Sequence, residues 1–181
     1  MIASTAQRVG EMVVERLRST CLQIEIAGSV RRRKADVKDV EIVAMPQRQG
    51  DLFGDPYGDC PLHNGIVELV DEGMIRWRNP PAAGASHRTQ VKKFYALEAV
   101  VTGLKIDLFA VRPPAEWGAI LAIRTGPADF SRMLVTKCRE RGLRCENGRL
   151  VGVDDDKTVP TPTEESFFRA CGVPWREPER R

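Results

Sequence analysis

The chain has 181 residues, of which 42% are hydrophobic, enough apolar side chain to build one domain or two small ones. Its formal net charge of +3 is mildly basic, which permits nucleic-acid binding without requiring it. The N-terminal residues are charged and amphipathic, and no apolar run is long enough to cross a bilayer, so neither a signal peptide nor a membrane contact is expected.

The cysteines are odd in number and contain no Cys-x-x-Cys pair, which predicts reduced, packing cysteines in an intracellular, cytoplasmic protein. Cys60 and His63 have the spacing of metal ligands, but they form only half a zinc site and no second pair follows. The chain has only two histidines, so catalysis is not expected to depend on a histidine pair.

The first elements are a helix and two strands. Ser4 with Gln7 resembles a capping box, and apolar residues recur at helical spacing across 4–19. Apolar runs predict strands at 22–28 and 39–45. The helix is interpreted as scaffold, and the segment between the two strands as a turn with a basic cluster.

That turn and the second strand carry candidate functional residues. Gly28 lets an anion approach the backbone, and Ser29 can begin a short helix whose free N–H groups attract phosphate. Asp39 and Glu41 lie two positions apart in a strand, so they share a face. Two acids on one face predict either a solvated edge or a bound cation.

The middle of the chain is predicted to contain two loops, a helix and a hairpin. The loops cover 47–59 and 79–88, and the helix covers 61–73. The hairpin joins strands at 93–101 and 104–111 through a Thr102-Gly103 turn.

The second strand of this hairpin holds a third acid among apolar residues. Asp107 needs a partner there, and Lys105 on the same face offers a simple salt bridge as one explanation.

Pro113-Pro114 marks a break before the last part of the chain. A helix is predicted across 128–141, and Asn147-Gly148 predicts a second hairpin. A last helix is expected to begin with Thr161 as N-cap and to run to Ala170.

The order of these motifs resembles the nucleotidyltransferase signature of polymerase beta and its relatives, the X-family DNA polymerases. The resemblance rests on a Gly-Ser turn, an Arg pair, an acid-x-acid strand, a third acid on a later strand and a Thr-Gly turn; the residues are Gly28, Ser29, Arg31, Arg32, Asp39, Glu41, Asp107, Thr125 and Gly126. It extends to the final Trp175-Arg176-Glu177-Pro178.

Five positions depart from the family pattern. Glu41 stands where the family usually has a second aspartate, and Lys105 where it usually has arginine. Ile123 and Arg124 replace two aromatic residues before the Thr-Gly turn, and Ser131 replaces an asparagine.

The resemblance implies an α+β fold: a nucleotidyltransferase palm with a mixed sheet and flanking helices over residues 1–112, then a small α/β thumb over 113–181. It implies metal binding by Asp39, Glu41 and Asp107, with Lys105 beside them in the catalytic site. Nucleotide binding would involve Gly28, Ser29, Arg32, Thr125, Gly126 and Ser131. The ion would be Mg²⁺, with Mn²⁺ as the alternative.

The leading functional hypothesis is a gap-filling DNA polymerase that takes nucleoside triphosphates and a primer–template or gapped DNA, acting as a monomer. Lys137, Arg139 and Arg141 would follow the DNA backbone, although helical geometry lets at most two of them contact one strand. Two alternatives stay open: a transferase that modifies a small molecule, a protein or an RNA end, and a catalytically inactive nucleic-acid-binding module.

Overall fold

The computed structural model describes residues 3–47, 60–79, 93–111 and 116–181. The chain divides into two compact units. The N-terminal unit comprises residues 1–26 and 35–110, and the C-terminal unit comprises residues 27–34 and 111–181. The segment 27–34 therefore packs with the later part of the chain, whereas the sequence suggested one division near residue 112.

The N-terminal unit is built on a mixed sheet, which has five strands within the described residues, in the order β1-β2-β5-β4-β3. β2 and β5 are parallel, and the other neighbours are antiparallel. The strands are β1 (Cys21–Ile26), β2 (Asp39–Pro46), β3 (Ile75–Trp77), β4 (Phe94–Ala99) and β5 (Lys105–Ala110).

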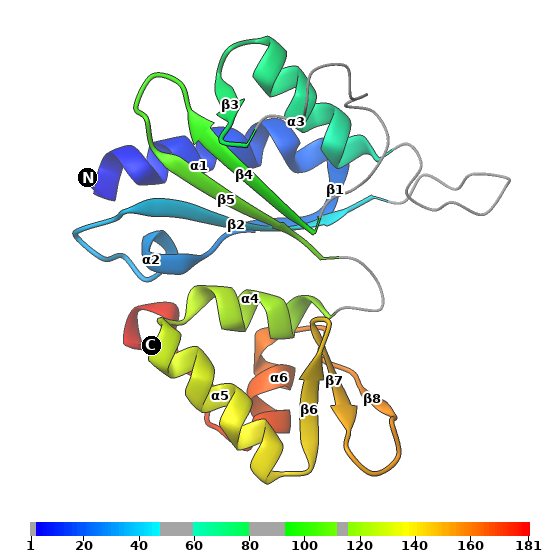
Figure 1. Ribbon diagram of the computed structural model, residues 1–181. Coiled ribbons are helices and arrows are strands. Elements are labelled where there is room, and N and C mark those ends of the chain that lie inside the picture. The colour runs from blue at the N-terminus through cyan, green and yellow to red at the C-terminus, as the bar shows by residue number, and fades with distance from the viewer. Residues whose placement is uncertain (1–2, 48–59, 80–92, 112–115) are drawn as a thin grey trace, which may run out of the picture. The chain divides into compact units, whose positions relative to one another are not determined.

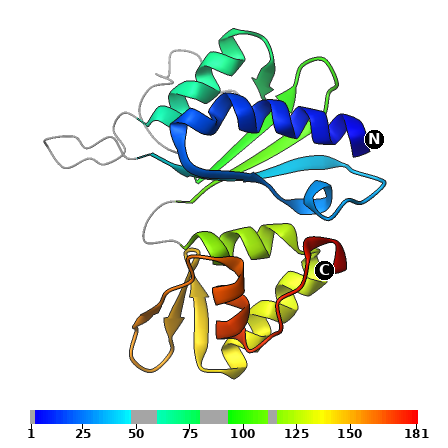
Figure 2. The same cartoon turned by 180° about the vertical axis from the view of Figure 1, so that it is seen from behind.

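Two helices, α1 (Ala3–Leu17) and α3 (Pro61–Asp71), cover one face of this sheet, as Figures 1 and 2 show from opposite sides. A 3₁₀ turn, η1 (Arg18–Thr20), joins α1 to β1. Alternate strand residues are buried beneath the helices, including Val40, Ile42, Ile106, Leu108, Tyr95 and Leu97. The residues between them lie on the opposite face, where they are available for function.

The strands and helices expected from the sequence are present in this unit, with ends shifted by no more than two residues. The expected hairpin is also present, and Gly103 has a φ of +65°, as a tight turn requires. β3 was not predicted. The expected loops lie almost entirely outside the described residues.

The C-terminal unit packs helices against a sheet of three strands among the described residues, in the order β6-β7-β8. Phe130, Leu134, Leu150, Phe167 and Phe168 lie in its core. The elements are α2 (Gly28–Arg31), α4 (Trp117–Thr125), α5 (Ala128–Glu140), β6 (Leu143–Glu146), β7 (Arg149–Gly152), β8 (Thr158–Val159), α6 (Glu164–Cys171) and η2 (Pro178–Arg180).

The Asn147-Gly148 hairpin and the last helix were predicted, but the start of the last helix was placed wrongly. Thr163, not Thr161, is the N-cap of α6, and Ser166 completes the capping box. The backbone of residues 161–163 instead lies against α4, where a Cβ on Gly118 would stand 2.0 Å from the Thr163 carbonyl oxygen. Only glycine fits there, and its N–H donates to the Thr161 carbonyl at 3.0 Å.

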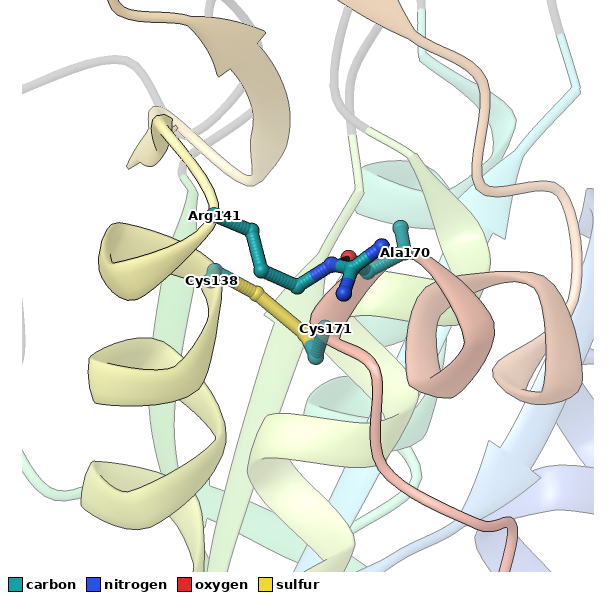
Figure 3. The surroundings of a disulfide bond; sticks show 4 residues. All are labelled: Cys138, Arg141, Ala170 and Cys171. Carbon is teal, nitrogen blue, oxygen red and sulfur yellow. Dashed lines mark hydrogen bonds between the residues drawn. A yellow bond between two sulfur atoms is a disulfide. The ribbon is translucent and has the colours of Figure 1, made fainter.

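The prediction that all cysteines are reduced was wrong for two of them. Cys138 on α5 and Cys171 at the end of α6 form a disulfide (Figure 3). Cys21, Cys60 and Cys145 are free. Burial raises the pKa of the Cys21 thiol to about 11, so it packs as a neutral side chain, as expected. Among the described residues, no helix is long and apolar enough to cross a membrane.

We expect the disulfide to stabilise the C-terminal unit through the loop it closes. The two cysteines are separated by 33 residues, and a loop of this length corresponds to about 4 kcal/mol in the chain-entropy model. Urea unfolding of this unit with and without dithiothreitol measures the loss, and the Cys138→Ala/Cys171→Ala double variant serves as the control. If the double variant lost the same stability on reduction as the parent, the effect would not come from this bond.

Candidate active site

The candidate catalytic residues lie on the face of the N-terminal sheet that α1 and α3 do not cover. Asp39 and Glu41 alternate with buried Val40 and Ile42 on β2. Asp107 lies on β5 directly opposite Glu41 in the parallel pairing. Because directly paired residues share a face, the three acids are brought to one side of the sheet.

Charged side chains extend this pattern across neighbouring strands. Four charged residues lie opposite one another on adjacent strands, in the order Arg76 (β3), Glu98 (β4), Lys105 (β5) and Asp39 (β2). Positive and negative charges therefore alternate across the sheet. Arg76 forms an ion pair with Glu98. Lys105 is exposed and lies between two carboxylate-bearing positions, Glu98 and Asp39.

The counter-ion of Asp107 is an arginine that the sequence did not indicate. Arg78 forms an ion pair with Asp107 in which both side chains are about three-quarters buried. The sequence had offered only Lys105 as a salt-bridge partner of Asp107. Arg78 follows β3, the strand that was not predicted. Without that strand, nothing in the sequence indicated that Arg78 lies beside Asp107.

Within the described part of the chain, no three His, Cys, Asp or Glu side chains are gathered closely enough to hold a metal ion. The carboxylate oxygens of Asp39, Glu41 and Asp107 are nevertheless the type of ligand that Mg²⁺ prefers. His63, half of the zinc pattern, instead lies among aromatic rings, with centroids 6.3 Å from Trp77 and 5.9 Å from Tyr95.

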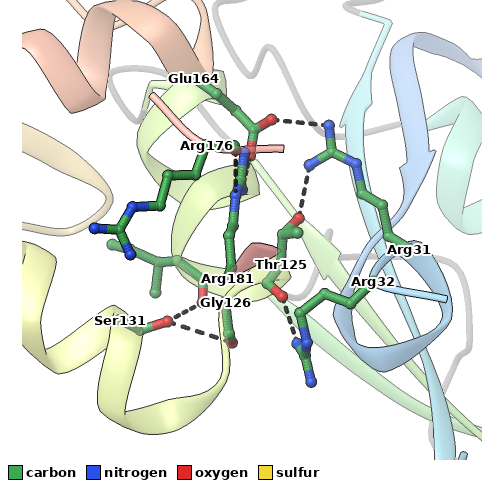
Figure 4. Close-up of polar contacts among 9 residues, drawn as sticks. Arg31, Arg32, Thr125, Gly126, Ser131, Glu164, Arg176 and Arg181 are labelled. Atoms are coloured by element: carbon green, nitrogen blue, oxygen red, sulfur yellow. Dashed lines mark hydrogen bonds and ion pairs between the residues drawn. The ribbon is translucent and has the colours of Figure 1, made fainter. Parts of the chain in front are cut away.

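The candidate nucleotide-binding residues lie together in the C-terminal unit. Gly28 has a φ of +62° and begins the four-residue α2, which contains Ser29 and packs against α4. Arg31 and Arg32 both donate to Thr125: Arg31 to its hydroxyl at 2.7 Å, and Arg32 to its carbonyl oxygen (Figure 4). The Gly-Ser turn and the Thr-Gly turn are therefore joined by the arginine pair.

The Thr-Gly turn is itself tightly packed. The Ser131 hydroxyl donates to the carbonyl oxygens of Ile123 at 2.7 Å and Gly126 at 3.4 Å. A Cβ at Gly126 would stand 2.9 Å from the Phe130 ring and from Ser131 Oγ. These contacts hold the turn at the end of α4 in one shape, so Ser131 supports it from α5.

A buried carboxylate anchors this arrangement, and the sequence did not predict it. Glu164 accepts from Arg31 at 2.8 Å and from Arg181 at 2.5 Å. Arg181 Nε also donates to the Arg176 carbonyl at 3.0 Å, which fixes the last residues against the same site (Figure 4). Burial alone would raise the pKa of Glu164, but hydrogen bonds from Arg181 and Arg31 outweigh it and hold the pKa below its usual range.

The expected DNA-contacting residues have different surroundings. Lys137 pairs with Glu140 at 2.6 Å. Arg141 Nε donates to the Ala170 carbonyl at 3.1 Å and its side chain packs on Gly172, so it caps the end of α6 (Figure 3). Arg139 is exposed on α5.

Residues 120–181 match the family model of the DNA polymerase beta thumb. The chain is therefore similar to X-family, polymerase beta-like DNA polymerases. One particular relative is DNA polymerase lambda of Rattus norvegicus, which is 28% identical over 178 residues covering 85% of this chain. The chain spans 28% of that relative's length.

We expect Glu164→Gln to destabilise the C-terminal unit by about 3–5 kcal/mol, the usual effect of breaking a buried ion pair on one side. Because its folded pKa is lowered, the carboxylate stabilises fully above its unfolded pKa of about 4.3 and loses this contribution as pH falls through the folded pKa. Urea unfolding at a series of acidic pH values measures both effects.

The matched control is Glu165→Gln, an exposed neighbour on the same helix. It should leave stability within about 0.5 kcal/mol of the parent. An acid dependence in Glu164→Gln as steep as the parent's would mean that another group controls it.

Proposed function

We propose that the chain is a nucleotidyltransferase that adds a nucleotide from a triphosphate to the 3′-hydroxyl of a DNA primer. The observation that carries the proposal is the pairing of β2 with β5, which puts Asp39, Glu41 and Asp107 on one face of the sheet. The thumb match at residues 120–181 supports a nucleic-acid substrate.

In this proposal the three acids bind Mg²⁺, with Mn²⁺ as a substitute. The bound ions would activate the primer hydroxyl and stabilise the leaving pyrophosphate. Lys105 balances the negative charge beside Asp39. The N-terminal sheet is then the nucleotidyltransferase palm.

Ser29 and Arg32 bind the terminal phosphates of the incoming nucleotide in this proposal. Arginine suits that role because its planar fork matches phosphate oxygens. Arg32 already contacts the Thr125 carbonyl, so phosphate binding and the shape of the Thr-Gly turn are linked. Thr125, Gly126 and Ser131 contact the nucleotide's sugar and base.

The test is primer extension on gapped DNA, with and without a template strand, using Asp39→Ala and Asp107→Ala. Each variant should lose at least about a thousandfold in rate, because loss of metal stabilisation costs several kcal/mol. Glu98→Ala, on the same face but outside the proposed metal set, is the matched control. Near-normal incorporation by either aspartate variant would falsify the site assignment.

A transfer to a small acceptor is the second candidate. Two of the three basic residues expected on DNA, Lys137 and Arg141, already contact other groups of the C-terminal unit. A small acceptor would not need a DNA-binding surface on α5. The contact of α5 with DNA is therefore tested separately from the metal site.

We expect Lys137→Ala and Arg139→Ala each to flatten the dependence of log affinity on log salt by about 0.9 on duplex DNA, the value for one phosphate contact. Affinity for gapped DNA at several salt concentrations measures this slope. Arg8→Ala, an exposed arginine on α1, is the control. Arg141 is left intact because its loss would disturb α6. Slopes equal to the parent's in both variants would favour the small-acceptor transferase.

A further inference from the structure

Arg78 reaches Asp107 across a gap that a small residue leaves open. Its N–H donates to the Ala96 carbonyl at 3.0 Å, so it continues the pairing of β3 with β4 by one position. Ala96 in turn lies opposite Asp107 on β5. The methyl group of Ala96 lets the longer arginine pass over β4 and contact the carboxylate on the next strand.

This ion pair is more than a surface contact. Arg78 and Asp107 keep only 24% and 25% of their side-chain exposure, so water and salt screen their attraction less than at an open surface. The Arg78 Nε is buried without a hydrogen-bond partner among the described residues. The guanidinium is held by the hydrogen bond that its Nη2 donates to Asp107, while Nε makes none within the described part of the chain.

Asp107 is also directly opposite Glu41. Two neighbouring carboxylates repel each other unless a cation lies close to them. Arg78 supplies that positive charge to Asp107. A divalent ion bound by the same carboxylates would bring a second cation to the atoms that Arg78 contacts, and the two cations repel.

We propose that Arg78 and the divalent metal ion are alternative partners of Asp107. Arg78 neutralises this carboxylate in the metal-free protein and gives it up when the metal binds, so Arg78 lowers the affinity of the metal site. This inference rests on the proposed function, because it takes Asp107 as a metal ligand. It assigns to Arg78 a role that neither the motif pattern nor the family match includes.

Arg76 provides a matched comparison. It lies two residues earlier, on β3, and forms an ion pair with Glu98 in which the arginine is more exposed, at 62%. It shares the face with Arg78, but Glu98 is outside the proposed metal set. Removing Arg76 changes the net charge of the face by the same amount without freeing a proposed ligand.

The experiment is Mn²⁺ titration of the whole chain, followed by electron paramagnetic resonance of the free ion, without nucleotide or DNA. Arg78→Ala should bind Mn²⁺ about tenfold more tightly than the parent, the scale of one charge-assisted hydrogen bond. Arg76→Ala should change the affinity by no more than about twofold. Arg78→Gln carries the same expectation if the alanine variant does not fold.

Thermal unfolding gives a second readout. Without metal, Arg78→Ala should melt below Arg76→Ala, because it loses the more buried of the two ion pairs. Saturating Mn²⁺ should then raise the melting temperature of Arg78→Ala by more than that of the parent, since tighter binding stabilises the folded state more.

Mn²⁺ affinity in Arg78→Ala that equals or falls below that of Arg76→Ala overturns the proposal; a weaker affinity would mean that Arg78 orients Asp107 for the metal. Failure of the proposed function looks different. If Asp107→Ala bound Mn²⁺ as tightly as the parent, Asp107 would not be a metal ligand, whatever the effect of Arg78.

Discussion

The parallel pairing of β2 with β5 is the constraint on which the N-terminal unit depends. It sits in the middle of the sheet, and buried residues alternate with less buried ones along the whole of β5 and over the first four residues of β2. A slip of one residue would turn Asp107 into the core and an apolar neighbour outward. The burial of Ile106 and Leu108 therefore fixes the position of the acid between them.

A different interaction organises the C-terminal unit. Glu164 is buried, and it is stable there only because Arg31 and Arg181 supply two positive charges. Arg31 comes from a segment 133 residues earlier, so a short stretch of the early chain completes a unit formed by the late chain. The same arginine contacts Thr125, which couples the buried charge to the turn proposed to bind the nucleotide.

Local patterns in the sequence predicted most elements and the strand on which Asp39 and Glu41 share a face, because strand alternation and turn residues act over a few positions. Features that depend on distant packing could not be predicted. Arg78 required knowledge that β3 pairs with β4 and that Ala96 leaves room beside Asp107. The disulfide required α5 and α6 to lie together, and the role of Glu164 required Arg31 to pack beside it from 133 residues earlier.

The packing of residues 27–34 with the C-terminal unit means that the two units are not consecutive modules along the chain. A fragment that begins at residue 111 would contain all of residues 120–181, which match the thumb model. It would lack Arg31, which pairs with Glu164, and it would lose the contacts of Arg31 and Arg32 with Thr125. Exchange of thumbs between related proteins by a single crossover would separate the same partners. Such a recombination would have to carry the short early segment along with the late one, so these two stretches are expected to be inherited together.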